Sequence, residues 1–130
     1  MPLSPSDPVW ALAILVTVFA SKHYVADFLL QTNWIAAGKE CQTGWVLPLT
    51  AHAGCHGLFT LAIALAIRPT LWWLGPLDFA VHFLIDKGKA TVGHAAQLTP
   101  QQEKFWWLLG LDQYLHQLTN IAISVALLVL

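Results

Sequence analysis

Four stretches of about 20 mostly apolar residues occupy nearly the whole chain, and they constrain its fold more than any other feature. They cover approximately residues 8–33, 45–67, 74–92 and 104–129. Stretches of this length are typical of helices that cross the roughly 30 Å hydrocarbon core of a membrane. The connections between them are short, so neighbouring helices must run antiparallel. The sequence therefore predicts an all-α fold, an integral membrane up-down four-helix bundle that forms a single domain over residues 1–130.

The composition agrees with a membrane protein whose main partner is lipid. Hydrophobic residues make up 57% of the chain, charged residues 10%, and the mean hydropathy is +0.61. A net charge of −1 without a basic cluster argues against a nucleic-acid partner. Cys41 and Cys55 show no CxxC spacing, which argues against a disulfide framework or a zinc knuckle. No Lys or Arg precedes the first apolar stretch and no cleavage signal follows it, so we expect it to stay in the mature protein.

Tryptophans and lysines predict how the bundle lies in the membrane. Tryptophan favours the interface between lipid and water, and all seven tryptophans fall near the ends of the predicted helices. Lysines gather at the surface marked by Trp34, Trp45, Trp106 and Trp107, whereas the opposite surface has only Arg68. Basic residues accumulate on the cytoplasmic side. We therefore expect a multi-pass protein of the plasma membrane, with both termini outside and the lysine-bearing surface in the cytoplasm.

Each of the four apolar stretches carries two ionisable residues four positions apart. Residues at this spacing lie on one face of a helix, so each helix presents a two-pronged polar face. An ionisable group inside a membrane costs roughly 3 kcal/mol or more and normally faces a partner in the bundle interior. The pairs are His23 and Asp27, His52 and His56, His82 and Asp86, and Asp112 and His116.

Counting 1.5 Å per residue from the tryptophans arranges these eight groups in two layers, about 10 and 16 Å below the cytoplasmic surface. The outer layer contains Asp27, His52, Asp86 and Asp112, and the inner layer contains His23, His56, His82 and His116. Carboxylates and imidazoles at matched depth suit Zn²⁺, Mn²⁺ or Fe²⁺. With about four ligands per ion, the set could hold one or two divalent metal ions. Metal-free His–Asp hydrogen bonds between helices, a haem and a proton relay remain alternatives.

Other polar residues flank the two layers. Gln31 and Lys89 lie toward the cytoplasmic mouth, and Gln113 lies about a quarter-turn from the polar face of the fourth helix; all three could contact a substrate or orient the metal ligands. Phe19 lies below the inner layer and would close the site on the far side. Lys22 lies near the middle of the membrane, and its partner cannot be identified from the sequence.

The motifs "HYVADFLLQ", "HAGCH", "HFLIDKGK" and "DQYLH" resemble a bacterial and phage-borne family of small integral membrane proteins known only as a domain of unknown function. The resemblance spans about residues 20–120 and implies a four-helix protein of the bacterial inner membrane. It brings no activity. The positions that match are His23, Asp27, Gln31, His82, Asp86, Lys89, Asp112, Gln113 and His116.

The leading functional hypothesis is a metal-dependent membrane hydrolase that acts on a lipid or phosphoester at the cytoplasmic face, with the ion activating water. An iron-dependent oxidase is a second enzymatic interpretation. Two non-enzymatic alternatives are a divalent-metal or proton transporter, and an assembly protein whose His–Asp core only fixes the bundle. Gly54 and Gly57 permit close helix contact through the second helix, either within the chain or in a homo-oligomer.

Overall fold

The computed structural model describes residues 7–130, which fold into helices joined by short connections. Asp7 is the N-cap of the first helix and Pro8 its first residue. The elements are α1 (Pro8–Tyr24), the π-helical turn η1 (Val25–Leu29), α2 (Asn33–Gly38), α3 (Val46–Ile67), the 3₁₀ turn η2 (Pro69–Leu71), α4 (Leu74–Ala95) and α5 (Glu103–Val129).

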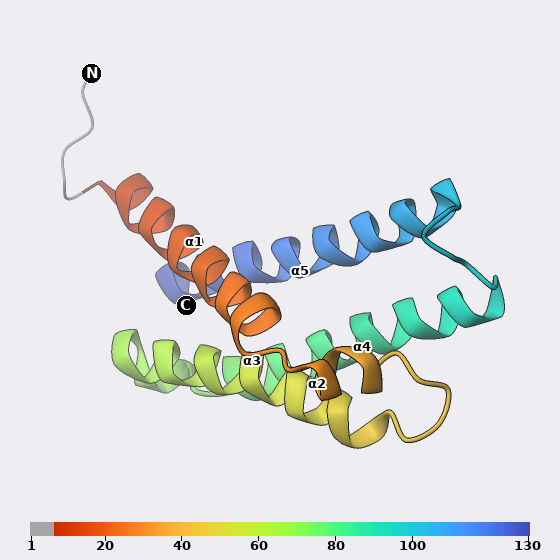
Figure 1. The fold of residues 1–130 in the computed structure, drawn as a ribbon. Coiled ribbons are helices and arrows are strands. Elements are labelled where there is room, and N and C mark those ends of the chain that lie inside the picture. The colour runs from red at the N-terminus through yellow and green to blue at the C-terminus, as the bar shows by residue number, and fades with distance from the viewer. Residues whose placement is uncertain (1–6) are drawn as a thin grey trace.

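Four long helices pack around a common interior (Figure 1). α4 packs against both α3 and α5, α1 packs against α5, and η1 completes the ring by contacting α3. The start of α1 and the end of α5 lie at one end of the bundle, which we call the terminal end. The connections from α2 to α3 and from α4 to α5 lie at the other end, which we call the loop end.

The first predicted helix, 8–33, ends earlier than expected. Its last turn is π-helical: the Leu30 N–H donates to the Val25 carbonyl, 2.9 Å away, and the helix stops. A separate helix, α2, then begins at Asn33, where the Thr32 hydroxyl accepts from the Ile35 N–H. The sequence assigned this region partly to the first helix and partly to a loop. The other long helices begin and end within three residues of their predicted bounds.

α3 and α4 approach each other at two glycines. A Cβ atom added at Gly57 would lie 2.8 Å from Phe79 Cβ, and one at Gly75 would lie 2.6 Å from Leu61 Cβ. The contact is therefore possible only without side chains at these positions. Of the two glycines that the sequence offered for helix contact, Gly57 is used within the chain, whereas Gly54 has nothing within 4 Å of its Cβ position.

The interior changes from apolar to polar along the bundle. At the terminal end, a hydrophobic cluster is formed by Leu15, Phe19, Ala64, Leu71, Leu74, Ile123 and Leu127. Toward the loop end, the same helix faces carry buried polar groups. On α4, for example, the buried positions follow each other at four-residue steps: Leu74, Asp78, His82, Asp86 and Ala90. The one-sided spacing seen in the sequence therefore corresponds to an inward-facing stripe.

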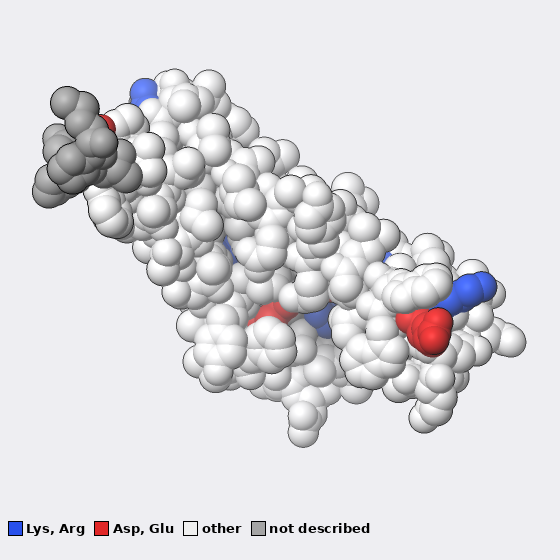
Figure 2. Space-filling view, turned by 90° about the horizontal axis from the view of Figure 1, so that it is seen from above, with Lys and Arg blue, Asp and Glu red and all other residues white. Residues whose placement is uncertain are grey.

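The outer surface of the bundle carries many large hydrophobic side chains. Leu84 is 69% exposed and Trp107 66%, whereas His56 is fully buried. Figure 2 shows a face with few charged side chains apart from its ends and a central recess where acidic and basic groups lie together. Two segments are long and apolar enough to cross a membrane, Pro8–Leu29 and Val46–Ile67. α4 and α5 are also long enough, at 22 and 27 residues, but their buried charged and polar side chains lower their hydropathy.

Candidate metal centre

The eight ionisable residues singled out from the sequence all lie in the bundle interior. Asp27 is the least buried, with 9% of its surface exposed. They come from α1, η1, α3, α4 and α5, so all four sides of the ring contribute. Six of them form two groups whose donor atoms lie within 4.8 Å of one another: Asp27, His52, His56 and His82 in the first group, and His82, Asp86 and His116 in the second.

The first group is the more compact of the two. Asp27 Oδ1 lies 2.8 Å from His56 Nε2 and 3.3 Å from His52 Nε2, and the Nε2 atoms of His52 and His82 are 3.3 Å apart. A tetrahedral ion bound at 2.0–2.1 Å separates its donors by about 3.3 Å. Two of these three separations match that value, and all four donor atoms lie within 4.8 Å of one another.

The second group shares His82 and is more open. Asp86 Oδ1 lies 3.0 Å from His116 Nε2, while Asp86 Oδ2 lies 3.9 Å from His82 Nε2. The rings of His56, His82 and His116 form a stack, with centroids 3.7 and 3.9 Å apart.

His23 and Asp112 lie beside the two groups rather than within them. His23 Nε2 is 3.1 Å from Asp27 Oδ2 and 3.1 Å from Gln113 Oε1, so it holds the far side of the Asp27 carboxylate. Asp112 Oδ1 lies 3.4 Å from His116 Nε2 but forms no hydrogen bond, and His56 Nδ1 is likewise buried without a hydrogen bond. Buried polar atoms without a hydrogen bond are costly, and here one borders the second group and the other belongs to a ligand of the first.

Lys39 reaches this centre unexpectedly. The sequence placed it on the membrane surface, but its Nζ atom lies 3.0 Å from Asp86 Oδ2 and the residue is only 8% exposed. It directly follows α2, which packs so closely on α3 that a Cβ at Gly38 would lie 2.5 Å from Pro48 Cγ. In the sequence, the signal for α2 was its N-cap residue, Thr32. A helix of six residues is too short to show hydrophobic periodicity. Its ammonium group adds positive charge beside the second group.

Lys22 finds its partners one layer nearer the terminal end. Its Nζ atom is 2.6 Å from Asp78 Oδ2 and 3.1 Å from Thr60 Oγ1, and the Thr60 hydroxyl also donates to Asp78. All three residues are buried. Phe19, fully buried, lies beneath Lys22 with its ring centroid 5.4 Å from Nζ. A fixed ammonium group and a phenyl ring thus separate the His/Asp groups from the terminal end.

On the opposite side, the centre meets a cavity of about 190 Å³ that we call the vestibule. Gln31, Lys89 and Gln113, the three flanking residues predicted from the sequence, all line it. Gln31 Oε1 has no hydrogen-bond partner, and Lys89 Nζ forms an ion pair with Glu40 Oε1 at 2.6 Å. Three carboxylates of the centre also line this cavity: Asp27, Asp86 and Asp112. A small molecule that enters the vestibule therefore meets the candidate ligands directly. His94 is exposed and contacts the Glu40 backbone carbonyl.

Residues 14–130 match one protein family, which is described as a protein of unknown function (DUF3307). No curated protein and no solved structure matches the chain.

Proposed function

The chain belongs to the DUF3307 family of proteins of unknown function, and from that premise we propose that it is an integral membrane protein with a divalent-metal site in its interior. In this proposal, all four long helices cross the plasma membrane of a bacterium, as one domain with the loop end in the cytoplasm. The site serves hydrolysis of a lipid or phosphoester that enters from the loop end.

The distribution of side chains supports four membrane crossings, although only two segments are apolar enough on average. Fourteen of the described residues with polar or charged side chains are buried, against eleven hydrophobic ones. Large hydrophobic side chains instead cover the outside of every long helix, including Leu84 on α4 and Leu111 on α5. In water, such a surface would be a large aggregation hazard, whereas lipid accommodates it. Helices of 22 residues span about 33 Å, which matches the hydrocarbon core.

The observation that carries the metal proposal is the first group, in which four donor atoms from three elements lie within 4.8 Å of one another, three of their separations being 2.8–3.3 Å. Zn²⁺, Mn²⁺ and Fe²⁺ accept this mixture of one carboxylate and three imidazoles. The Lys39 ammonium beside Asp86 disfavours a second positive charge there, so one ion in the first group is the primary state. A second ion would have to share His82.

A divalent ion held by the first group would polarise a carbonyl or phosphoryl oxygen of the substrate, and so favour attack of water on the attached carbon or phosphorus atom. The chain would contribute the rest. Asp112 Oδ1 faces the centre without a hydrogen-bonded proton donor, so it can accept a proton from an attacking water molecule. Gln31 can orient the substrate from the vestibule wall, and Lys89 can pair with a negatively charged group of the substrate.

Elemental analysis of the detergent-purified protein tests the metal site. We expect the wild type to retain about one equivalent of a divalent metal and His82→Ala to lose it, because His82 belongs to both groups. His94→Ala is the matched control, since it removes an exposed imidazole at the loop end. The Co²⁺-loaded wild type provides a second measurement that requires no variant, because tetrahedral nitrogen and oxygen ligation gives intense visible absorption. Negligible metal in all preparations and no such absorption would leave hydrogen-bonded His–Asp pairs as the role of the centre.

A transporter is the second candidate, because polar residues continue past the centre toward the terminal end at Thr60, Asp78 and Asn120. The Lys22 ammonium and Phe19 oppose it, since both close this path to a cation. We therefore expect sealed vesicles containing the wild type to show no divalent-metal flux above protein-free vesicles. Flux in the wild type that disappears in His82→Ala would replace the hydrolase proposal with transport.

A further inference from the structure

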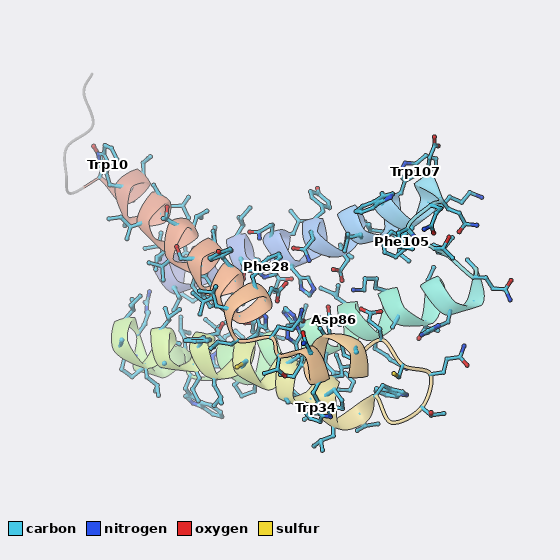
Figure 3. All side chains as sticks on the ribbon, in the orientation of Figure 1. Trp10, Phe28, Trp34, Asp86, Phe105 and Trp107 are labelled. Atoms are coloured by element: carbon cyan, nitrogen blue, oxygen red, sulfur yellow. The ribbon has the colours of Figure 1, made fainter. Side chains whose placement is uncertain are left out.

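Beyond the vestibule, the loop end has two further cavities along the seam between α4 and α5. One, of about 330 Å³, lies among apolar side chains that include Leu98, Phe105 and Leu108. The other, of about 270 Å³, is bordered by Leu84, Val92 and Leu115, among others. Figure 3 shows Phe105 on the side of α5 that faces α4, whereas Trp107 points away. The two helices diverge toward this end in Figure 1.

Shared residues connect these cavities with the vestibule. Lys89 lines all three. Leu109 lines both the larger cavity and the vestibule, and Asp112 lines both the vestibule and the smaller seam cavity. The three cavities are therefore adjacent. We call the vestibule, at the candidate metal centre, the polar arm, the two seam cavities between α4 and α5 the apolar arm, and Lys89, which lines all three cavities, the corner.

The charges at the corner are suited to a phosphate. Lys89 Nζ is paired with Glu40, but the Glu40 side chain is 41% exposed and its carboxylate can move into water. A phosphate that replaced it would keep a charged hydrogen bond on Lys89. Four carboxylates and two lysines line the vestibule, which leaves a charge of −2 that one divalent ion neutralises. An anion is therefore repelled from the metal-free protein and admitted by the metal-loaded one.

We propose that this space binds an anionic phospholipid, with its phosphate at Lys89 and one acyl chain in the seam between α4 and α5. The lipid enters sideways from the cytoplasmic leaflet, and its ester bonds come to lie beside the metal centre. This inference rests on the proposed function, because it names the substrate class of that same site. A water-soluble phosphoester would leave the apolar arm unfilled, and a neutral lipid would leave Lys89 without a new partner.

Native mass spectrometry of the metal-loaded protein in detergent tests the proposal with three probes: phosphatidylglycerol, diacylglycerol and glycerol 3-phosphate. We expect phosphatidylglycerol to bind at least tenfold more tightly than either of the others. Removal of the metal with a chelator should weaken its binding. Lys89→Met should lose the preference for phosphatidylglycerol over diacylglycerol while keeping its metal, because Lys89 belongs to neither ligand group. Lys104→Met is the matched control, since this exposed lysine at the same end lines none of the three cavities.

A second variant tests the apolar arm. Leu108→Gln places an amide in both seam cavities without changing charge, and we expect it to weaken phosphatidylglycerol binding several-fold while glycerol 3-phosphate is unaffected. Equal affinity for all three probes, or equal phosphatidylglycerol binding by Lys89→Met and wild type, would overturn the lipid site. If either result occurred in protein that retained its metal, the metal site itself would stand. Absence of metal from the wild type would instead remove the proposed function.

Discussion

His56 and His116 allow the two ligand groups to be separated by single substitutions. His56 belongs only to the first group and His116 only to the second. Because the Lys39 ammonium opposes an ion at the second group, we expect His56→Ala to lose the retained metal and His116→Ala to keep it. Loss of one metal ligand typically weakens affinity by orders of magnitude, which equilibrium dialysis against Zn²⁺ measures. If His116→Ala lost the metal and His56→Ala kept it, the primary ion would lie in the second group, at Asp86.

Lys22 should be a stability residue rather than a ligand. Removing one partner of a buried ion pair leaves an uncompensated charge, which costs about 3–5 kcal/mol. We expect Lys22→Met to lower the melting temperature in detergent markedly, because Asp78 would keep only the Thr60 hydroxyl. Lys22→Met combined with Asp78→Asn should recover part of the loss. A melting temperature unchanged by the single substitution would show that the pair is not formed in the folded protein.

Asp112 should separate catalysis from metal binding, because it belongs to neither ligand group yet borders His116. General bases contribute about 10²–10⁴-fold to rate. We expect Asp112→Asn to lower hydrolysis of phosphatidylglycerol by the metal-loaded protein by this factor while the metal content stays constant. Lys104→Met is the comparison, since Lys104 is exposed at the same end and does not line the vestibule. Equal rates in Asp112→Asn and the wild type would remove Asp112 as the base.

The sequence predicted which ionisable residues face the interior, because one chemical rule applied to all four helices. Ionisable groups in apolar helices must face inward, and the four-residue spacing fixes a shared face. The rule could not identify Lys39, whose position depends on how α2 packs on α3. It also could not pair Lys22 with Asp78, because that pairing depends on the rotation of α1 relative to α4.

At the scale of elements, the contact between α3 and α4 depends on the absence of side chains at two positions. Gly75→Ala places a Cβ 2.6 Å from Leu61 Cβ and 3.0 Å from the Gly57 carbonyl oxygen, so the helices must separate. Such overpacking typically costs about 1–3 kcal/mol. Gly54→Ala meets nothing within 4 Å and should gain up to about 1 kcal/mol from better helix propensity. Thermal unfolding in detergent measures both, and equal melting temperatures would contradict this account of the contact.

The break between α1 and α2 is the element that apolar periodicity missed. The apolar run continues through Leu29 and Leu30, and no Gly or Pro follows it before Trp34, so hydropathy alone extends the helix. The π-helical turn instead shifts the register by one residue at Asp27 and ends the helix at the level of the vestibule. This end lets α2 fold back over α3 and bring Lys39 inward. The hydrogen bond from the Leu30 N–H to the Val25 carbonyl therefore helps to shape one wall of the vestibule.

At the scale of the whole molecule, the even number of long helices brings the start of α1 and the end of α5 to one end of the bundle (Figure 1). Of the described lysines, only Lys22 lies away from the loop end. The others follow α2, lie in the second half of α4 or lie in the first turn of α5: Lys39, Lys87, Lys89 and Lys104. If this end faces the cytoplasm, the vestibule and the seam cavities open to the cytoplasmic leaflet. Orientation in the membrane thus decides which pool of lipid the proposed site can reach.

The native cysteines can report this orientation. Cys41 is exposed at the loop end, so in a Cys55→Ser background we expect a membrane-impermeant maleimide to label it in inverted vesicles but not in intact spheroplasts. Thr70, exposed at the terminal end, provides the matched position. In a chain lacking both native cysteines, Thr70→Cys should be labelled in spheroplasts instead. Labelling of both sites from the same side would mean that α3 does not cross the membrane, because α3 is the only long helix between them in the described chain.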